Sequence, residues 1–229
     1  MKFLCLVCIV VFLFASFGVF GQGTYLEKGV NGFGVELRTM VSPQEFNGIG
    51  FSTGYSIAGI LDIGFLLDYT LGEISGSDSS ELALGFDYNV NVLKQSETVP
   101  LSVQITGSYG LARVESDFLE SNDLERIATG YNIGLDLARK FRLTSYWFLR
   151  FNALIDYESF SYLTTDRTAV PPTPPTTQKS VQDLFWGGGL GFLFVFPKGQ
   201  VLALQAELRA DQDQKLEIRP ILAAAFPQN

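Results

Sequence analysis

Charged side chains stand at alternate positions within otherwise apolar segments of this sequence. In three segments a glutamate precedes an arginine by two residues, as Glu36 precedes Arg38. Carboxylates beside arginines in low-dielectric surroundings can donate or accept protons with shifted pKa values. Buried charges also need partners, so the same residues can simply form ion pairs that rigidify a fold. We favour ion pairing for the full set of candidates, which is Glu36, Arg38, Asp68, Glu81, Asp87, Asp136, Arg150, Asp156, Glu207, Arg209, Glu217 and Arg219.

The composition excludes several catalytic mechanisms. The sequence contains no histidine, and Cys5 and Cys8 are its two cysteines. A histidine-dependent nucleophile is therefore impossible, and a cysteine nucleophile is lost if the N-terminal residues are removed. We expect neither enzymatic activity, nor a cofactor, nor a metal site.

The charge balance excludes nucleic acid as a ligand. The chain of 229 residues has 16 basic and 24 acidic residues, a net charge of −8, without a cluster of lysines and arginines. Binding to phosphates requires such a cluster. With 47% hydrophobic residues, the composition predicts a packed or membrane-embedded fold.

The N-terminus has the three parts of a secretory signal peptide. Lys2 precedes an unbroken apolar run, and small residues and a polar exit follow it. We expect cleavage near Gly21, giving a signal peptide over residues 1–21, a short segment over 22–29 and a folded domain over 30–229. An uncleaved membrane anchor is the alternative, which the length of the apolar run permits.

A period of two runs through the rest of the chain. In the segment 101–112, apolar and aromatic residues occupy one side, and small or polar residues occupy the other. This alternation predicts β-strands, because helical spacing would scatter the same residues around the axis. Most runs have about the length that a tilted strand needs to cross a bilayer. About ten strands are expected, near residues 33–41, 49–58, 60–72, 81–92, 101–113, 126–138, 143–158, 183–196, 200–210 and 215–226.

The connections between these strands alternate between short and polar. If the strands form a barrel, all the short joins lie at one end, which we call the turn rim, and the polar joins lie at the opposite end, which we call the loop rim. Such unequal rims are typical of outer-membrane barrels. The short joins follow the second, fourth, sixth and eighth strands, at 58–59, 94–100, 139–142 and 197–200. The polar joins that follow the third, fifth, seventh and ninth strands are 73–80, 114–126, 157–182 and 211–214.

The glycine-rich segment Asp183–Pro197 is best interpreted as one of these strands. It lacks the lysine and hydroxyl residue of a P-loop and the spacing of a dinucleotide fingerprint. Its apolar run is also too short for a transmembrane helix. Read as a strand, Gly187, Gly189 and Gly191 fall on the inner face, where glycine relieves crowding in a narrow barrel.

This pattern resembles the small, porin-like β-barrel proteins of the bacterial outer membrane, over essentially the whole chain after the signal peptide. The resemblance implies a closed, antiparallel, up-and-down transmembrane barrel of about ten strands, with eight possible. It also implies recognition of the C-terminal strand near Phe226 by the barrel assembly machinery, although Pro220 interrupts that strand. Aromatic residues expected at the membrane interfaces are Tyr69, Tyr109, Tyr157 and Trp186 toward the loop rim, and Trp147, Phe196 and Phe226 toward the turn rim.

Three functions remain open on these grounds. We favour a structural or surface-interaction role, with a partner at the Pro- and Thr-rich loop 168–178. The first alternative is a narrow, cation-preferring pore, because acidic residues outnumber basic ones on the inner face. The second is a secreted, soluble barrel with an apolar ligand, which requires the aromatic face to point inward.

Overall fold

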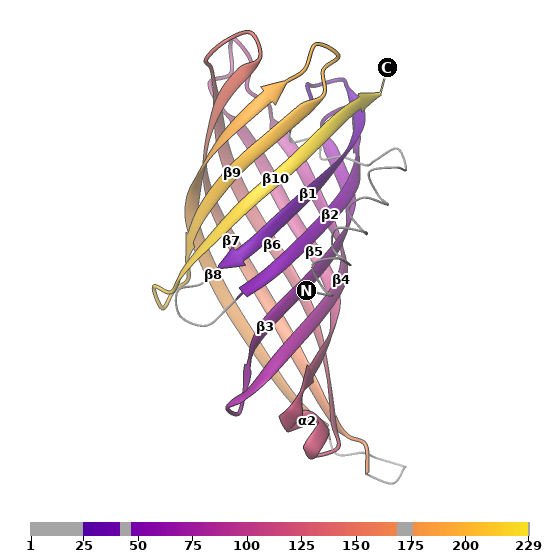
Figure 1. Ribbon diagram of the computed structural model, residues 1–229. Helices are drawn as coiled ribbons and strands as arrows, with labels where there is room; N and C mark the ends of the chain where they lie inside the picture. Colours follow the sequence, from indigo (N-terminus) through magenta and orange to yellow (C-terminus); the bar gives the residue numbers. More distant parts are fainter. Residues whose placement is uncertain (1–24, 42–46, 169–175, 229) are drawn as a thin grey trace, which may run out of the picture.

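A computed structural model describes residues 25–41, 47–168 and 176–228, and these residues form one closed antiparallel barrel (Figure 1). Each strand is hydrogen-bonded to its neighbours in sequence, and the first pairs with the last. The expected barrel of ten strands is confirmed. The strands are β1 (Asn31–Val41), β2 (Asn47–Ile57), β3 (Leu61–Ile74), β4 (Ser77–Leu93), β5 (Ser102–Ser116), β6 (Leu124–Arg142), β7 (Trp147–Asp166), β8 (Thr176–Val195), β9 (Val201–Ala210) and β10 (Leu216–Gln228).

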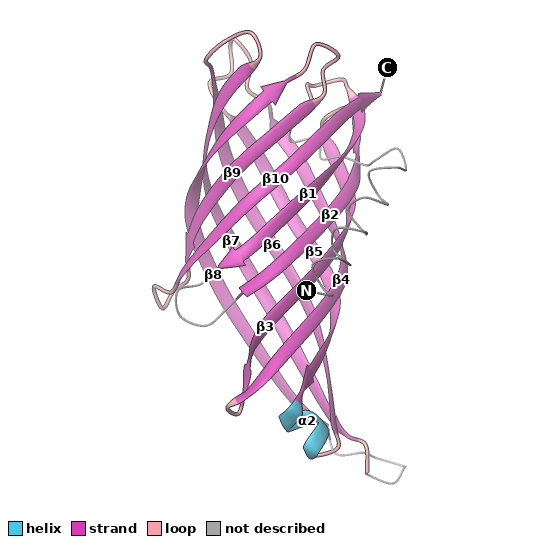
Figure 2. Cartoon of the chain, in the orientation of Figure 1, coloured by secondary structure: helices cyan, strands magenta, loops and turns pink. Residues whose placement is uncertain are grey.

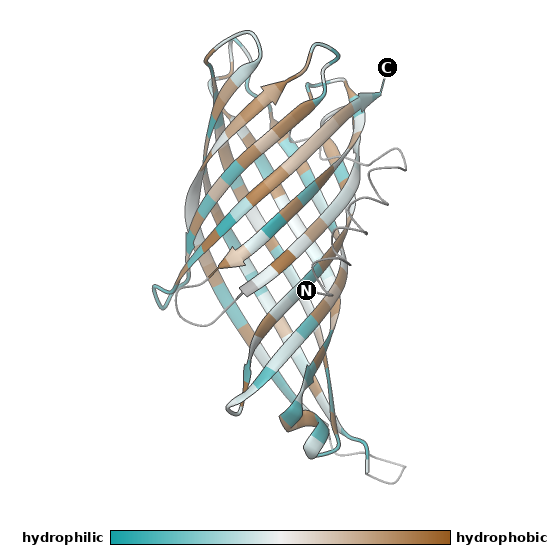
Figure 3. Ribbon diagram, viewed as in Figure 1, coloured by the Kyte–Doolittle hydropathy of each residue, from teal (hydrophilic) through white to brown (hydrophobic). Residues whose placement is uncertain are grey.

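The apolar face of the barrel points outward. Figure 3 shows hydrophobic bands alternating with polar positions along the strands. Phe65, Leu84 and Phe86 are 62%, 61% and 56% exposed, whereas Arg150 and Arg209 are 3% and 1% exposed. The soluble barrel with an apolar ligand is therefore wrong, because its aromatic face would have to line the interior.

An outer wall of this kind requires a lipid environment. Leucine, isoleucine and phenylalanine side chains cover the outside of neighbouring strands, far beyond the isolated apolar residues of a soluble surface. In hydrocarbon every backbone polar group must be bonded within the protein, and closure of the barrel meets that demand. The barrel therefore spans a bilayer.

The short turns lie together at the end of the barrel that holds the C-terminus (Figure 1). One expected boundary there is wrong. Residues 139–142, expected as a turn, belong to β6, and the connection to β7 is 143–146. The Leu143 and Thr144 amides both donate to the Trp147 carbonyl, at 2.9 and 3.2 Å, which closes the tight turn.

The polar segments at the loop rim are mostly strand rather than loop, which corrects the sequence-based expectation. Residues 73–80 form the ends of β3 and β4 around a tight turn at Ser75 and Gly76, whose φ angles are 53° and 80°. Within 114–126 the chain leaves β5, forms the short helix α2 (Asp117–Ser121) and enters β6 (Figure 2). Hydrophilic composition does not distinguish a loop from a strand with both faces in water, and this is the reason for the error.

Strands β7 and β8 extend furthest into the polar segments at the loop rim. Their pairing runs without interruption from Trp147 and Phe194 to Thr165 and Thr176. The intervening residues 169–175, which hold most of the loop 168–178, lie outside the described residues. The signal peptide expected over 1–21 also lies outside them.

Pro220 does not end the last strand. It is exposed on the outer wall, opposite Ala206 of β9. The pairing of β10 with β1 skips the residues beside it, passing from Arg38 and Ile221 to Val41 and Ile218 in unchanged register. The missing amide donor of proline therefore leaves a local gap in the ladder, and the strand continues past it.

Among the described residues no helix is long and apolar enough to cross a membrane.

A charge on the outer wall should destabilise the barrel strongly. We expect Phe86→Arg to lower the free energy of unfolding by about 2–4 kcal/mol, because arginine near the bilayer midplane loses its hydration. Phe86→Leu is the matched control and should cost much less. Urea titration in lipid vesicles, followed by the mobility of unboiled protein on a gel, measures both. Equal stability of the two variants would argue against a lipid-facing Phe86.

Candidate functional site in the barrel lumen

The charged residues singled out from the sequence all lie on the inner face of the barrel. They surround a cavity of about 480 Å³, to which eleven of the twelve contribute lining atoms. Arg209, the twelfth, is the largest fully buried side chain. The two-residue period of each strand turns these side chains inward, while their apolar neighbours face the membrane.

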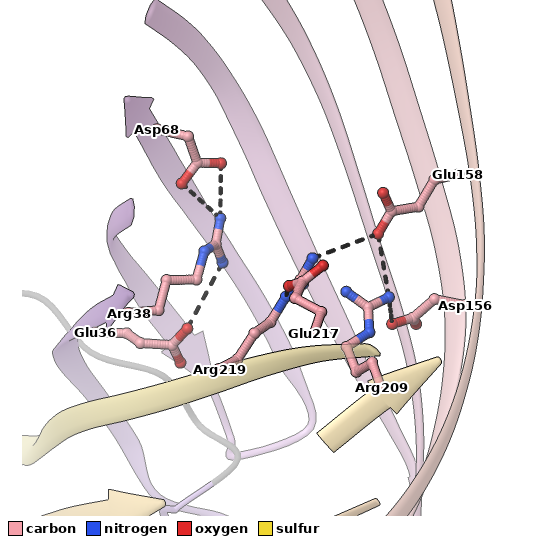
Figure 4. Close-up of polar contacts among 8 residues, drawn as sticks. All are labelled: Glu36, Arg38, Asp68, Asp156, Glu158, Arg209, Glu217 and Arg219. Carbon is pink, nitrogen blue, oxygen red and sulfur yellow. Dashed lines mark hydrogen bonds and ion pairs between the residues drawn. The ribbon is translucent and has the colours of Figure 1, made fainter. Parts of the chain in front are cut away.

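One ion-pair group lies between β1 and β3 (Figure 4). The Arg38 guanidinium donates to both carboxylate oxygens of Asp68, at 2.9 and 3.0 Å. The same arginine lies 3.6 Å from the Glu36 carboxylate. Gly50 stands beneath this group, and a Cβ there would lie 2.1 Å from Asp68 Oδ1. The glycine therefore makes room for the bridge.

A second group joins β7, β9 and β10 on another part of the wall (Figure 4). Arg209 donates to Asp156 at 2.5 Å and to Glu158 at 3.1 Å. Glu158 also lies 3.8 Å from Arg219, which donates in turn to Glu217. Glu158 thus links two arginines that belong to different strands. Sequence reasoning missed it, although its position two residues after Asp156 places it on the same face.

The third group is centred on Arg150 of β7. Its guanidinium donates to Asp136 and to Gln205, both at 2.6 Å. Gln205 and Asn152 donate to Glu207 at 2.7 and 3.0 Å. Neutral amides therefore extend the ion pair into a network across β6, β7 and β9. Pairing of this kind is costly to break, because removing one partner leaves a buried charge.

Carboxylates remain in excess after these pairings. Ten carboxylate side chains and three arginines line the cavity. Among the described residues, no lysine or arginine forms an ion pair with Glu81 or Asp87. Low-dielectric walls lined by one sign of charge focus the field and concentrate ions of the opposite sign. The cavity therefore has the electrostatics of a site for cations. No three acidic residues of the described chain cluster closely enough to hold a metal ion.

The lumen continues toward the loop rim. A second cavity of about 410 Å³ shares Thr70, Glu81 and Tyr162 with the first. Its other lining residues, such as Ile74 and Thr177, belong to the extended ends of the strands. The acidic cavity therefore adjoins a second cavity on the side of the loop rim.

Near the turn rim the barrel holds two residues that sequence reasoning did not connect with the lumen. Tyr25 and Leu26 are buried in an apolar cluster inside the barrel, with Leu193, Ala203 and Ala223 among its members. The signal available in the sequence was that Tyr25 and Leu26 are adjacent apolar residues within a polar stretch, which indicates a buried contact. This segment precedes β1 and so is free of the barrel ladder.

Lys94, in the turn between β4 and β5, contacts this segment and donates to the Leu26 carbonyl. Burial lowers the pKa of the Lys94 ammonium to about 8, while the nearby carboxylates of Asp62 and Glu27 act in the opposite direction.

The aromatic residues expected at the membrane interfaces lie on the outer wall. Tyr109, Trp147, Trp186, Phe196 and Phe226 are exposed, and Tyr69 and Tyr157 are partly exposed. Near the turn rim the rings contact one another. Phe194 lies 4.8 Å from Trp147 and 4.6 Å from Phe196, measured between ring centroids. Edge and tilted contacts at these distances stabilise aromatic pairs.

Comparison with known proteins finds similarity in structure alone. No protein-family model and no curated protein sequence matches the chain. The translocator domain of the autotransporter NalP from Neisseria meningitidis is similar with a TM-score of 0.55 and 8% identity, over 86% of this chain and 88% of that one. The β domain of the Bordetella autotransporter BrkA has a TM-score of 0.45 and 13% identity, over 88% of this chain and all of that one.

At such low identity the likeness concerns the fold. The architecture is that of bacterial outer-membrane β-barrels, as expected from the sequence. Together with the apolar outer wall and the even number of strands, this fold places the chain in the bacterial outer membrane.

Proposed function

We propose that this outer-membrane barrel binds a partner at the cell surface through strands that project beyond the bilayer at the loop rim. The supporting observation is the unequal length of the strands. Strands β6, β7 and β8 have 19 or 20 residues, whereas β1, β2 and β9 have 10 or 11. A tilted strand crosses a membrane in about 9–11 residues, so the long strands extend well beyond it.

The projecting part of β8 has an open edge. Strand β9 pairs with β8 from Trp186 onward, so residues 176–185 pair with β7 on one side alone, within the described chain. The carbonyl of Gln182 points away from β7, because it accepts a hydrogen bond of 3.2 Å from the Gln212 side chain. In an antiparallel strand the amide of a residue points to the same side as its carbonyl.

In a strand, the backbone amide and carbonyl of every second residue point to the same side as those of Gln182. Ser180 and Gln178 therefore also present their backbone groups away from β7. A row of backbone donors and acceptors that no neighbouring strand pairs is the complement of an extended peptide, which can bind by adding a strand to the sheet. The partner that fits is a protein segment in extended conformation. Residues 176–178, the described C-terminal part of the segment 168–178 predicted as a surface contact, belong to this edge.

Proline at the open edge should abolish this binding. We expect Ser180→Pro to remove an edge amide without breaking the pairing of β7 with β8, and so to eliminate partner capture. Ser180→Ala is the matched control, because it removes the same hydroxyl and keeps the amide. Cells that display each variant are treated with a membrane-impermeant cross-linker, and adducts of the barrel are compared. A specific adduct with the wild type and Ser180→Ala that disappears in Ser180→Pro supports the proposal. Adducts with all three variants, or with none, would contradict it.

The second candidate function is a narrow pore that prefers cations. The observation that favours it is the excess of carboxylates around the luminal cavity. A barrel of ten strands leaves little free cross-section, so conductance should be small. The ion pairs of Arg38, Arg150 and Arg209 narrow it further.

Neutralising the carboxylates without ion pairs should weaken the preference. We expect the double variant Glu81→Gln and Asp87→Asn to lower the permeability ratio of K⁺ to Cl⁻ by up to about fivefold per charge, since a nearby unit charge in water contributes about 1 kcal/mol. Glu115→Gln is the control, because that exposed carboxylate lies outside the cavity. Reversal potentials in planar bilayers give the ratio. An unchanged ratio, or absence of conductance, would sink the pore hypothesis.

Export and assembly complete the proposal. Residues 1–21 direct secretion and are removed, and the assembly machinery recognises the C-terminal strand. In support of the second step, Phe226 lies exposed on the outer wall of β10, opposite Phe33 of β1. The role is one of binding or permeation rather than of catalysis.

A further inference from the structure

We propose that the segment Tyr25–Val30 is a stopper that controls passage through the lumen. This inference rests on the second candidate function, the narrow pore, and assigns its regulation. The segment precedes β1 and enters the barrel at the turn rim, where Tyr25 both joins the apolar cluster and lines the acidic cavity. Tyr25 therefore lies at the boundary between the cavity and the turn rim.

The inner wall provides a seat for Leu26. This side chain is 3% exposed and shares the apolar cluster with Ala203, Ala223 and Ala225, all small residues of β9 and β10. On β1, a Cβ added to Gly32 would lie 2.5 Å from Leu26 Cδ1. Small residues on three adjoining strands thus leave the space that one leucine fills. The neighbouring cavity is lined by ten carboxylates and three arginines, whereas this patch is apolar and matches the leucine of the stopper.

The backbone attachments of the stopper to other described residues lie outside the strand ladder. The Gly29 amide donates to the Ala58 carbonyl at 2.8 Å, and the Lys94 ammonium donates to the Leu26 carbonyl. The Val30 amide bonds within the segment itself, to Glu27 at 3.2 Å. None of these bonds belongs to the ladder between strands. The segment can therefore leave its seat without breaking the ladder that closes the barrel, which makes its departure a local opening.

The charged side chains of the lumen lack this freedom. Arg150 and Arg209 extend from strands that are paired on both sides. Arg150 is held by Asp136 of the adjoining β6, and Arg209 is held by Asp156 of β7, two strands away. They narrow the lumen permanently, whereas the stopper obstructs it reversibly. Departure of the stopper connects the acidic cavity to the turn rim, and small cations are the solutes that its charge admits.

Weakening the seat should open the lumen. We expect Leu26→Ala to raise both the mean conductance of the full-length protein in planar bilayers and the reactivity of a cysteine placed in the seat. Truncation of a buried leucine shifts such an equilibrium by roughly tenfold or more. The reporter cysteine is Ala225→Cys, because Ala225 is fully buried in the same cluster. A charged, membrane-impermeant thiol reagent in proteoliposomes measures its rate of labelling.

Two further variants make the test specific. Leu204→Ala truncates a leucine of β9 that faces the lipid, and it should change neither readout. Lys94→Met removes the hydrogen bond to the Leu26 carbonyl and should raise both readouts by a smaller factor. The chain without Ala225→Cys gives the background labelling. Gel mobility without boiling confirms that each variant is folded.

The two readouts separate the stopper from the pore. Faster labelling and higher conductance in Leu26→Ala establish the stopper. Unchanged labelling with measurable conductance in all variants overturns it and leaves the pore standing. Faster labelling without conductance shows a mobile segment in a lumen that does not conduct, and it overturns both the pore and the control of passage.

Discussion

Every backbone N–H and C=O group inside the bilayer must be bonded within the protein, and the rest of this structure follows from that constraint. A flat sheet would leave two unpaired edges in lipid, so the first strand closes on the last. Pro220, one of two prolines in β10, illustrates the effect of a missing donor on this ladder. Pro220 lacks a donor, and the β1–β10 ladder is interrupted beside it and resumes in the same register.

Closure then determines where charge can be placed. Alternate side chains of a strand point to opposite faces, and the outer face is reserved for apolar groups. Acidic and basic residues are therefore confined to a narrow interior, where they must find partners. The arginines meet this demand by bridging strands, as Arg209 does with Asp156 at 2.5 Å across 53 residues of sequence. The carboxylates that exceed the arginines make the lumen attractive to cations.

The constraint ends where the membrane ends, and the two rims differ for that reason. Beyond the bilayer a strand edge can stay open to water, and residues 176–185 of β8 have such an edge. At the turn rim the strands stop early, and the segment before β1 folds into the barrel mouth. The proposed surface contact and the proposed control of the lumen thus lie at opposite ends of one rigid wall, where the backbone is free of the ladder.

The sequence by itself determined the number of strands, their two faces and the inward position of the charged residues. A period of two is a local property, and neighbouring residues alone decide it. The extended strands at the loop rim could not be recognised this way, because a polar strand in water and a polar loop have the same composition.

The tertiary structure alone decided which carboxylate meets which arginine. Those pairs depend on the register between strands and on closure, which bring Asp68 to Arg38 and Glu158 to both Arg209 and Arg219. It also decided that Tyr25 and Leu26 are buried inside the barrel near the turn rim. Their burial comes from small residues on β1, β9 and β10, which only the closed barrel brings together around one leucine.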